Sequence, residues 1–470
     1  MIYSKIKLSP PQSALPFPDT KSAGFDWALV LNNLDFTKCL DGQSVELTQF
    51  DRFLGALGAS HLLNFAFAQR LDRNTPWDIT NVSVPWRLAI KAASRVYKRG
   101  VKLIPADTKH ISIQETEIIF LDSNQQKAND RIPKDFEFFD YIEDGDFIVI
   151  DKNFYDLNIK SLSKLAKYRH HVVNILEREK THLSAVKLSN AITASVTRIV
   201  TIGGGVLGDL VGFVASQREI QSVYIPTTLL SMADSSVGGK TGINFEPYGK
   251  NQVGAFHFPA KTIIEPKCLA TLPMREIYSG LAECLKHAFI SNDRSLWDGL
   301  IEISRSSLDQ MEICELLKIV QVKADIVSRD PFEYGERALL NFGHTLGHAL
   351  ETFSIERDGD QCLSHGQCVI VGMIYAIRLA QKKSLFKKGD PIVQQLLNTA
   401  LVPSLNFDSQ AVGQYISNNI SNDKKASHSK VRWVLPSKFG AFHRGSDNQW
   451  TVEHEFDSEL FCNLMDELGN

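Results

Sequence analysis

Three histidines and one glutamate in the second half of the chain have the types and spacing of ligands for a divalent metal ion. His344 and His348 lie four residues apart in NFGHTLGHALE, so they share one face of the helix that this segment predicts. His365 follows in LSHGQ, and Glu283 lies upstream in SGLAECLKHA. Two or three imidazoles and one carboxylate can bind an ion such as zinc. The alternative is a structural hydrogen-bonding role, which is common for single histidines in helices.

Two glycine-rich segments have the composition of sites for anionic groups. Residues 203–209 (GGGVLGD) fit the GxGxxG pattern, follow a predicted strand and precede a predicted helix, which is an arrangement that can hold a pyrophosphate. A tight strand-to-helix turn without a ligand gives the same pattern. Residues 234–241 (DSSVGGKT) and 249–251 (GKN) put glycines beside lysines, and lysine holds phosphate or carboxylate as a compact charge. Surface lysines in a glycine loop are the alternative there.

The elements that must position these residues follow from the hydrophobic pattern. Short apolar runs predict buried strands at 147–151, 198–202, 223–226 and 262–266. These runs alternate with helical stretches, which is typical of a parallel α/β sheet. Helical periodicity then dominates at 275–290, 308–328, 337–353 and 366–381.

The domain organisation predicted from this pattern has three parts. We expect an N-terminal extension of unknown role at 1–120, an α/β nucleotide-binding domain at 121–272 and a mostly α-helical metal- and substrate-binding domain at 273–470. The site should lie in the cleft between the last two parts. Within the extension, several prolines predict a loosely structured arm over residues 1 to about 20, and helical spacing recurs at 47–70 and 86–97.

Composition excludes several classes of protein. The formal net charge of −3 argues against nucleic acid or an anionic membrane as the main partner. No apolar run approaches the length of a membrane span, and the N-terminus does not have the pattern of a secretory signal. The seven cysteines are scattered and form no CxxC pair, which suits free thiols in a reducing compartment. We therefore expect a cytoplasmic protein with a small-molecule ligand.

Taken together, these motifs resemble 3-dehydroquinate synthase of the sugar-phosphate cyclase superfamily. The segments that carry the resemblance are GGGVLGDLVGFVAS, IPTTLLSMADSSVGGKTGIN, GKNQVGAF, LATLPMREIYSGLAECLKHA, ERALLNFGHTLGHALE and SHGQ. The resemblance is firm from about residue 203 to 373, weaker at 148–200 and near DKK at 423–425, and absent from the first 120 residues. The superfamily has a nucleotide-binding α/β domain joined to a helical metal domain.

The resemblance implies two cofactors, a divalent metal ion (zinc or cobalt) and NAD. Glu283, His344 and His365 would be the metal ligands. Asp151 and Asn153 match the motif that binds the adenosine of NAD, and Glu177 and Lys180 keep the spacing of another NAD-contacting pair, although the usual glycine before the glutamate is missing. The other positions implied for NAD are Gly204, Gly205, Val206, Asp209, Thr227, Thr228, Leu230, Asp234, Lys240, Lys250, Thr271 and Glu276.

The resemblance also implies a set of substrate-binding and catalytic residues. They are His348, Lys286, Arg218, Asn251, Lys240, Lys323, Glu333, Arg337, Asn341 and Lys425, with Lys424 as the alternative to the last. Arg218 lies as far before Pro226 as the arginine of the family that binds the substrate phosphate. Lys240 would be shared between NAD and substrate.

The reaction implied by the resemblance converts 3-deoxy-arabino-heptulosonate 7-phosphate to 3-dehydroquinate and phosphate. NAD⁺ oxidises the C5 hydroxyl, phosphate is eliminated, the ketone is reduced again and the ring closes by an aldol step, so the enzyme is a lyase overall. The metal would polarise the C5 hydroxyl, and His348 could move its proton. The resemblance implies a homodimer as well.

The substrate is the main point on which alternatives remain. Related cyclases act on sedoheptulose 7-phosphate or glucose 6-phosphate, which lack the carboxylate. Lys240, Lys323 and Arg337 match the dehydroquinate synthase pattern, and a buried cation without a partner carboxylate is unfavourable, so we expect the carboxylated substrate. The alternatives are a cyclase of secondary metabolism with another sugar phosphate, a glycerol-dehydrogenase-like oxidoreductase and a catalytically silent scaffold.

Three features depart from the family pattern. The long N-terminal region is not typical of the bacterial enzyme. The usual HGE reads HGQ at 365–367, so Gln367 replaces a carboxylate near the metal, and metal affinity would change if that group orients His365. The segment between residues 216 and 226 is shorter than usual.

Overall fold

The computed structural model describes residues 2–8, 116–121, 133 and 135–469, apart from 246–248, 306–312, 334, 360–361, 405–406, 423–429 and 446–447. The helices predicted at 47–70 and 86–97 lie outside these residues, and so do Lys424 and Lys425. Among the described helices, none has both the length and the hydropathy needed to cross a bilayer.

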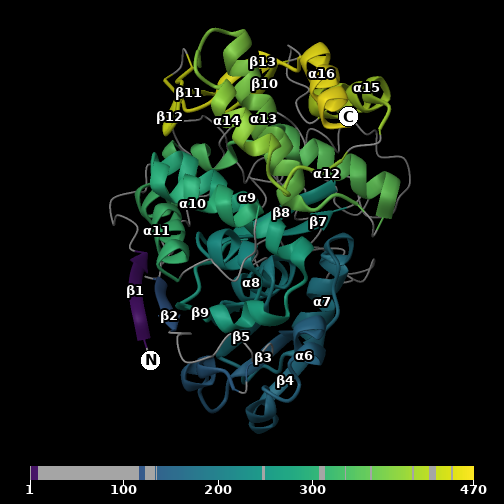
Figure 1. Cartoon of the computed structure of the whole chain (residues 1–470). Coiled ribbons are helices and arrows are strands. Elements are labelled where there is room, and N and C mark those ends of the chain that lie inside the picture. The colour runs from purple at the N-terminus through teal and green to yellow at the C-terminus, as the bar shows by residue number, and fades with distance from the viewer. Residues whose placement is uncertain are drawn as a thin grey trace, which may run out of the picture.

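A seven-stranded sheet forms the lower half of the described structure (Figure 1), with strand order β1-β2-β9-β6-β5-β3-β4. In that order the strands are Ile2–Leu8, Thr116–Leu121, Lys261–Ile264, Gln221–Pro226, Arg198–Gly203, Phe147–Asp151 and Arg169–Val173. All neighbouring strands are parallel except β1 and β2. The four predicted strands are confirmed, and their unbroken apolar runs are those of strands buried on both faces.

The N-terminal strand β1 corrects one prediction. Residues 1 to about 20 were expected to form a loosely structured arm, but Ile2–Leu8 pairs antiparallel with β2 along its length. The segment IYSKIKL carries a period-2 signal, because Ile6 and Leu8 alternate with Lys5 and Lys7.

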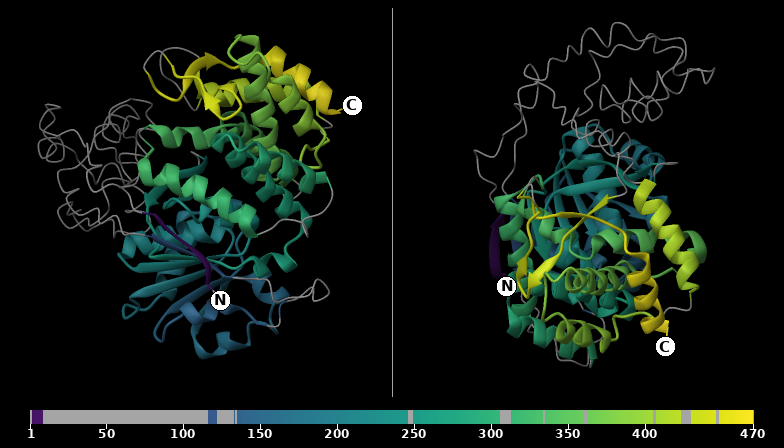
Figure 2. Two further views of the ribbon diagram at one scale, coloured as in Figure 1. Left: turned by 60° about the vertical axis from the view of Figure 1, so that its left-hand side comes forward. Right: turned by 90° about the horizontal axis from the view of Figure 1, so that it is seen from above.

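Two layers cover the faces of the sheet (Figure 2). One face packs against α7 (His182–Ala191), α8 (Gly205–Arg218) and the hairpin of β7 (Lys240–Phe245) and β8 (Gly249–Phe256), around a buried cluster that includes Val149, Leu210 and Val214. The other face joins the helical half through one continuous core, which runs from Ile150 and Val200 to residues of the helical half.

The helical half lies above the sheet in Figure 1. Its helices are α9 (Met274–Ser291), α10 (Arg294–Arg305), α11 (Ile313–Arg329), α12 (His344–Asp358), α13 (His365–Lys382), α14 (Asp390–Leu397), α15 (Ser409–Asn422) and α16 (Ser458–Gly469). Two small antiparallel pairs complete it, β10 (Lys430–Trp433) with β13 (Val452–Glu455) and β11 (Pro436–Lys438) with β12 (Ala441–Phe442). The helices predicted at 275–290 and 366–381 are confirmed.

The helix predicted at 337–353 is interrupted, which is a second correction. A 3₁₀ segment, η10 (Glu336–Asn341), ends before Phe342, and α12 begins only after Gly343. Gly343 has φ 80°, a left-handed conformation that favours glycine. The break makes His344 the first residue of α12, so its side chain stands at the helix N-terminus.

Helices α12 and α13 pack with their backbones in close contact. A Cβ atom added at Gly372 in α13 would lie 1.9 Å from the carbonyl oxygen of Gly343, and one at Gly366 would lie 2.3 Å from the carbonyl oxygen of Ser279 in α9. Residues without a side chain are therefore needed at both crossings. These contacts hold together the beginnings of α12 and α13 and the middle of α9, where the four predicted metal-site residues are found.

Candidate active site

The glycine-rich loop lies where the strand order of the sheet reverses. Strand β3 has β4 on one side and β5 on the other, so the carboxyl ends of β3 and β5 flank a crevice. Gly203 ends β5, and a Cβ atom added to it would lie 3.3 Å from Cβ of Asp151 at the end of β3. The structure thus brings the predicted adenosine-binding aspartate next to the loop.

The loop leads directly into the N-terminus of α8. Added Cβ atoms at Gly204 and Gly205 would lie 3.0 Å from Cγ2 of Thr228 and 2.9 Å from Oγ of Ser235. The hydroxyl of Tyr224 donates to the carbonyl oxygen of Gly204 at 2.8 Å and so supports the loop from below. The first N–H groups of α8 have no partner within the helix, and they can donate to phosphate oxygens.

Asp151 has a second role as the N-cap of α6 (Lys152–Leu157). Its Oδ1 accepts from the backbone N–H of Phe154 at 3.0 Å, and burial raises the pKa of its carboxyl. Asn153 follows in the first turn of α6 and is exposed. Thr227 is placed beside the loop by its backbone N–H, which donates to the carbonyl oxygen of Gly203 at 3.0 Å.

Four residues predicted for NAD form a chain of alternating charges. Lys180 is 1% exposed, and its Nζ lies 2.6 Å from Oδ2 of Asp209 and 3.2 Å from Oε1 of Glu177. Lys250 lies 3.6 Å from the same Glu177 oxygen and 2.9 Å from Oε1 of Glu351 in α12. Burial lowers the pKa of Lys180, but Asp209 and Glu177 outweigh it and raise the pKa above its usual value. The chain of charges therefore reaches from the loop to the helical half.

The three predicted metal ligands converge on one point. Oε1 of Glu283 in α9 lies 3.4 Å from Nε2 of His344 and 3.3 Å from Nε2 of His365. Glu283 is fully buried, and its Oε1 accepts no hydrogen bond within the described structure. One ligand atom from each residue lies within 4.8 Å of the others, so the set can hold a divalent cation.

The surroundings of the two imidazoles leave Nε2 facing this point. Nδ1 of His344 lies 3.2 Å from the carbonyl oxygen of Phe342, and Nδ1 of His365 lies 3.3 Å from Oε2 of Glu351. Burial lowers the pKa of His344 to about 3, so its imidazole is neutral. Burial also lowers the pKa of His365, but Glu351 and Glu283 outweigh it and raise the pKa to about 9. Metal binding would therefore displace a proton from His365.

His348 stands one helical turn from His344 and is exposed. Its ring centroid lies 5.0 Å from that of His344 and 5.9 Å from that of His365. An imidazole in this place can exchange protons both with solvent and with a group bound at the three-ligand site.

A cluster of cations surrounds Asp234, which lies in the π-turn η7 (Ser231–Ser235). Its Oδ1 is 2.8 Å from Nζ of Lys323, 3.8 Å from Nζ of Lys286 and 3.2 Å from Nε2 of His287. Burial would raise the pKa of Asp234, but Lys323 and Lys286 hold it well below its usual range. Lys286 also pairs with Glu283, so this cluster adjoins the metal ligands.

Arg337, Lys240, Glu333 and Asn341 form a second group of predicted substrate-site residues. Arg337 is 2% exposed and donates to the carbonyl oxygens of Pro331 and Gly238. Among the described residues, no carboxylate lies within 4.0 Å of its guanidinium nitrogens. Glu333 pairs with Lys240 and accepts from Nδ2 of Asn341 at 2.6 Å. The structure thus links Lys240, Glu333 and Asn341 directly, while Arg337 is buried nearby against Gly238, two residues before Lys240.

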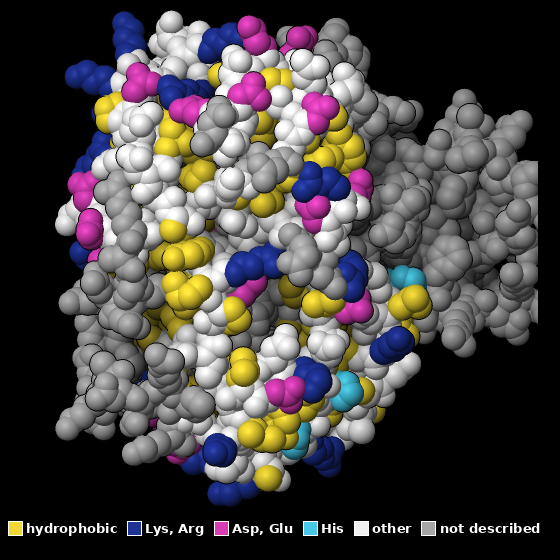
Figure 3. All heavy atoms as spheres, turned by 45° about the vertical axis from the view of Figure 1, so that its right-hand side comes forward, with side chains coloured by type: hydrophobic (Ala, Val, Ile, Leu, Met, Phe, Trp, Pro, Cys, Tyr) yellow, Lys and Arg dark blue, Asp and Glu magenta, His cyan; other side chains and the backbone are white. Residues whose placement is uncertain are grey.

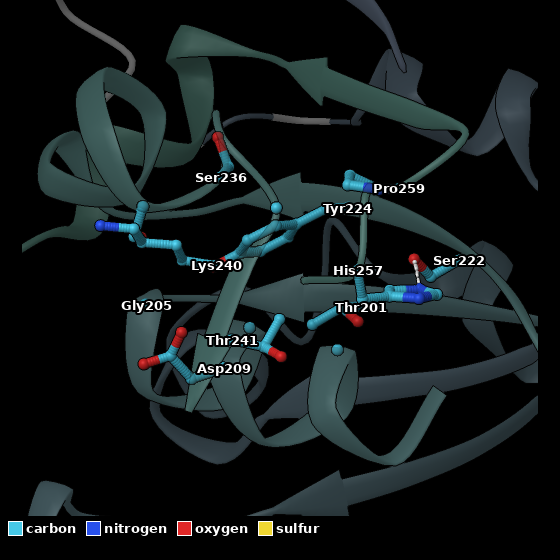
Figure 4. A pocket seen from close by; sticks show the side chains of 14 residues that line it. Thr201, Gly205, Asp209, Ser222, Tyr224, Ser236, Lys240, Thr241, His257 and Pro259 are labelled. Carbon is cyan, nitrogen blue, oxygen red and sulfur yellow. Dashed lines mark hydrogen bonds between the residues drawn. The ribbon is translucent and has the colours of Figure 1, made fainter. Parts of the chain in front are cut away.

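A small pocket extends from the start of α8 toward β6 (Figure 4). Figure 4 shows Asp209 and Lys240 on one side of it and the hydrogen-bonded pair of Ser222 and His257 on the other. The atoms of this pair, Oγ and Nε2, lie 2.8 Å apart, and burial lowers the pKa of His257 to about 4. Figure 3 shows the surface hollowed between the two halves, with basic and acidic side chains beside the hollow.

One predicted residue, Arg218, is not brought to this region, which corrects the sequence-based expectation for a single chain. Arg218 is the last of the 14 residues of α8, so it lies about 20 Å from the loop. Its guanidinium donates to the carbonyl oxygens of Ser189 and Ile192 at 2.8 and 2.6 Å, near the end of α7. The role of Arg218 here is to satisfy the carbonyl groups at a helix terminus.

The structure places the remaining predicted residues as follows. Oγ1 of Thr271 accepts from Nδ2 of Asn158 at 2.9 Å, and Glu276 is exposed in the first turn of α9. Asn251 has φ 52°, and its backbone N–H donates to Oδ1 of Asn244 at 3.0 Å. The structure shows where these residues lie, but the NAD-binding, substrate-binding and metal-binding roles of all the predicted site residues, including Val206 and Leu230, stay predictions.

Gln367 does not take the place expected for the carboxylate of HGE. Its Oε1 accepts from the backbone N–H of Ser364 at 2.9 Å, and the Ser364 hydroxyl accepts from the Gln367 N–H at 3.3 Å. This reciprocal pair is a capping box at the start of α13. Glu351 contacts His365 instead. The sequence contains a signal for it, because Glu351 is seven residues after His344 and three after His348 on the same helix face.

Comparisons with known proteins identify relatives of this chain. A family model described as 3-dehydroquinate synthase N-terminal matches residues 171–279, and one described as 3-dehydroquinate synthase C-terminal matches residues 280–426. The 3-dehydroquinate synthase of Nostoc punctiforme is 40% identical over 293 residues, which are 60% of this chain and 75% of that protein. That of Aliivibrio fischeri (strain MJ11) is 42% identical over 250 residues, 52% of this chain and 67% of that protein.

Two solved structures have the same fold. 2-epi-5-epi-valiolone synthase from Streptomyces hygroscopicus subsp. jinggangensis, solved with NAD⁺ and Zn²⁺ bound, matches with a TM-score of 0.59 and 26% identity over 75% of this chain and 96% of that one. A 2-deoxy-scyllo-inosose synthase, solved with carbaglucose-6-phosphate, NAD⁺ and Co²⁺, matches with a TM-score of 0.60 and 23% identity over 76% of this chain and 97% of that one.

Proposed function

The chain belongs to the 3-dehydroquinate synthase family, and we propose that it converts 3-deoxy-arabino-heptulosonate 7-phosphate to 3-dehydroquinate and phosphate, using NAD and one divalent metal ion, zinc or cobalt. The observation that carries this proposal is the convergence of Glu283, His344 and His365 beside the cations around Asp234. The named synthases at about 40% identity support the reaction. The NAD⁺ and Zn²⁺ bound by the valiolone synthase support the cofactors.

The residues present fit NAD. Gly204 and Gly205 are closely packed against Thr228 and Ser235 and lead into the N-terminus of α8, which suits a pyrophosphate. Asp151 at the end of β3 can accept hydrogen bonds from ribose hydroxyls. Lys180 and Lys250 then stabilise the loop side of the site through Asp209 and Glu177.

The residues present also fit a metal ion. Glu283, His344 and His365 would hold it, because each offers a ligand atom and the carboxylate oxygen between the imidazoles accepts no hydrogen bond within the described structure. When bound, NAD supplies reversible oxidation of a substrate hydroxyl, and the metal ion polarises that oxygen. His348, exposed beside the ligands, takes the hydroxyl proton on a ring nitrogen and passes it to solvent.

The cations hold the two anionic ends of the substrate. Lys286 and Lys323 lie beside the metal ligands and can bind phosphate oxygens, so that the leaving group is positioned rather than chemically activated. Arg337 is buried, and within the described structure no carboxylate pairs with it, so a substrate carboxylate would complete its environment. This favours 3-deoxy-arabino-heptulosonate 7-phosphate over carboxylate-free sugar phosphates.

Three further statements are part of the proposal. We retain the division into an N-terminal extension, an NAD-binding part at 121–272 and a metal- and substrate-binding part at 273–470. A homodimer and a cytoplasmic location are proposed from the family resemblance. Neither nucleic acid nor a membrane is proposed as a partner.

A phosphate-release assay tests the proposed function. Purified protein with NAD⁺ and Zn²⁺ or Co²⁺ should release phosphate from 3-deoxy-arabino-heptulosonate 7-phosphate without net formation of NADH. Glu283→Gln should abolish both this release and Co²⁺ binding. Release from sedoheptulose 7-phosphate alone would assign the chain to the related cyclases of secondary metabolism, and steady NADH formation with glycerol would assign it to the dehydrogenases.

A further inference from the structure

Glu351 lies between the metal site and the cofactor side of the protein. It is in the second turn of α12, is 6% exposed, and divides its two oxygens between two partners. Oε2 lies 3.3 Å from Nδ1 of His365, and Oε1 lies 2.9 Å from Nζ of Lys250. Lys250 belongs to β8 of the hairpin that packs on α8, whereas His365 begins α13.

A carboxylate in this place decides which nitrogen of His365 is available for a metal. When Glu351 accepts from Nδ1–H, the lone pair of the imidazole is on Nε2, and Nε2 is the atom that faces Glu283. The same hydrogen bond prevents the ring from turning. Because α13 starts at His365, no earlier turn of that helix holds the side chain.

Lys250 keeps the carboxylate in this role. Its ammonium group donates to Oε1 of Glu351 and also lies 3.6 Å from Oε1 of Glu177. Glu177 pairs with Lys180, which in turn pairs with Asp209 at the glycine loop. The ion pair therefore ties the hairpin beside the nucleotide loop to the helix that carries His344 and His348.

We propose that Glu351 is a positioning residue that orients His365 for the metal ion, and that Lys250 acts on the metal site through Glu351. The inference rests on the proposed function, because it requires the metal site of Glu283, His344 and His365. In this chain Gln367 stands where the family usually has a glutamate. Its side chain caps α13 and so does not supply the contact with His365.

A second set of possible metal ligands suggests an alternative role for Glu351, that of a metal ligand. His348, Glu351 and His365 also have ligand atoms within 4.8 Å of one another. If Glu351 were a metal ligand itself, it would coordinate an ion with the oxygens that now contact His365 and Lys250. Metal stoichiometry separates the two roles, since a positioning residue leaves one ion per chain in both parent and variant.

Co²⁺ titration of the full-length chain, followed by visible absorption, tests the proposal. Glu351→Gln should raise the Kd for Co²⁺ about 10- to 100-fold and change the shape of the Co²⁺ absorption bands at one ion per chain. Glu351→Asp should recover part of the affinity. The matched control is Glu356→Gln on the same helix, whose carboxylate is exposed and bonded to Tyr415, and it should leave the Kd unchanged.

A double-variant cycle tests the link to Lys250. Lys250→Met should raise the Kd for Co²⁺ less than Glu351→Gln does, and adding it to Glu351→Gln should have no further effect on that Kd. Additive effects of the two changes would overturn the link. If Glu351→Gln does not fold, the effect of Lys250→Met on the Co²⁺ bands still decides it, because unchanged bands contradict the proposal.

The outcomes for this inference differ from those for the proposed function. Unchanged Co²⁺ affinity and bands in Glu351→Gln would overturn the positioning role while the parent still released phosphate. A fall from two bound ions to one would show that Glu351 is a ligand and would also overturn it. A parent that neither bound Co²⁺ nor released phosphate would instead contradict the proposed function.

Discussion

Gly372→Ala tests how closely the metal site depends on the contact between α12 and α13. A Cβ atom at Gly372 lies 1.9 Å from O and 2.8 Å from C of Gly343, the residue directly before His344. Real Cβ atoms essentially never lie under 3.0 Å from such an atom, so the two backbones would have to separate by roughly 1 Å. The contacts are with backbone atoms, which cannot rotate away as a flexible side chain can.

The expected magnitude follows from this displacement. Overpacking of a close helix contact lowers the free energy of unfolding by about 1–3 kcal/mol. A shift of roughly 1 Å at His344 also exceeds the tolerance of about 0.5 Å for a functional constellation. Misplacement on this scale lowers activity by about 100-fold, and we expect Co²⁺ affinity to fall as well.

Gly413→Ala is the matched control. Gly413 is inside α15, and its Cβ atom would lie 3.5 Å from Sγ of Cys462, an ordinary contact. Because alanine favours helix, this change should stabilise the protein by up to about 1 kcal/mol. Urea unfolding and Co²⁺ titration of both variants provide the measurement. Equal stability and equal Co²⁺ affinity of the two variants would refute the close contact between α12 and α13.

Three further results are expected. Arg337→Ala should lower kcat/KM for the carboxylated substrate by about 30-fold or more and leave the Kd for NAD unchanged. Arg329→Ala, at an exposed arginine, should change neither value. Equal activity of Arg337→Ala and the parent would contradict the proposal that Arg337 binds the substrate carboxylate. His257 binds fewer protons when folded, because its pKa falls from 6.5 to about 4, so stability should fall by at most about 3 kcal/mol as the pH drops from 6.5 to 4. Urea unfolding of His257→Gln should show a smaller loss over that range, and an identical loss would disprove the assignment. Chelation should stop phosphate release but leave NAD bound, as measured by fluorescence, and Zn²⁺ should restore release.

The sequence predicted the parts of the fold that have a strong, uninterrupted pattern. The apolar runs of strands β3, β5, β6 and β9 are typical of buried strands. Helices α9 and α13 keep the helical spacing of apolar residues from end to end. Strand β1 was missed because its alternating run, Lys5 to Leu8, is short and precedes a proline-rich stretch, and the prolines decided the interpretation of the whole arm. The break before α12 was missed because η10 has a sequence compatible with helix, and only the positive φ of Gly343 interrupts it.

The site was predicted less evenly, for physical reasons. Spacing along one helix identifies His344 and His348, and a resemblance in motif order supplied Glu283 and His365. The expectation for Arg218 used its distance from Pro226 along the chain, but helix α8 carries Arg218 away from the loop, whereas Pro226 pairs with Gly203 beside it. Glu351 and His287 were assigned no role. The spacing of Glu351 from His344 and His348 is a signal that the prediction did not use, whereas a single imidazole such as His287 has no signal until its partners are known.

The distribution of partners within the cation cluster argues for a site prepared for a dianionic or trianionic substrate. Lys323 and Lys286 share Asp234, and Lys240 pairs with Glu333, so each already interacts with a carboxylate of the protein. A substrate phosphate would have to compete with these carboxylates. Arg337 instead donates to two carbonyl oxygens, and a substrate carboxylate could join it without displacing any described acidic side chain. Arg337 should therefore discriminate between substrates, whereas the lysines should affect the binding of every sugar phosphate.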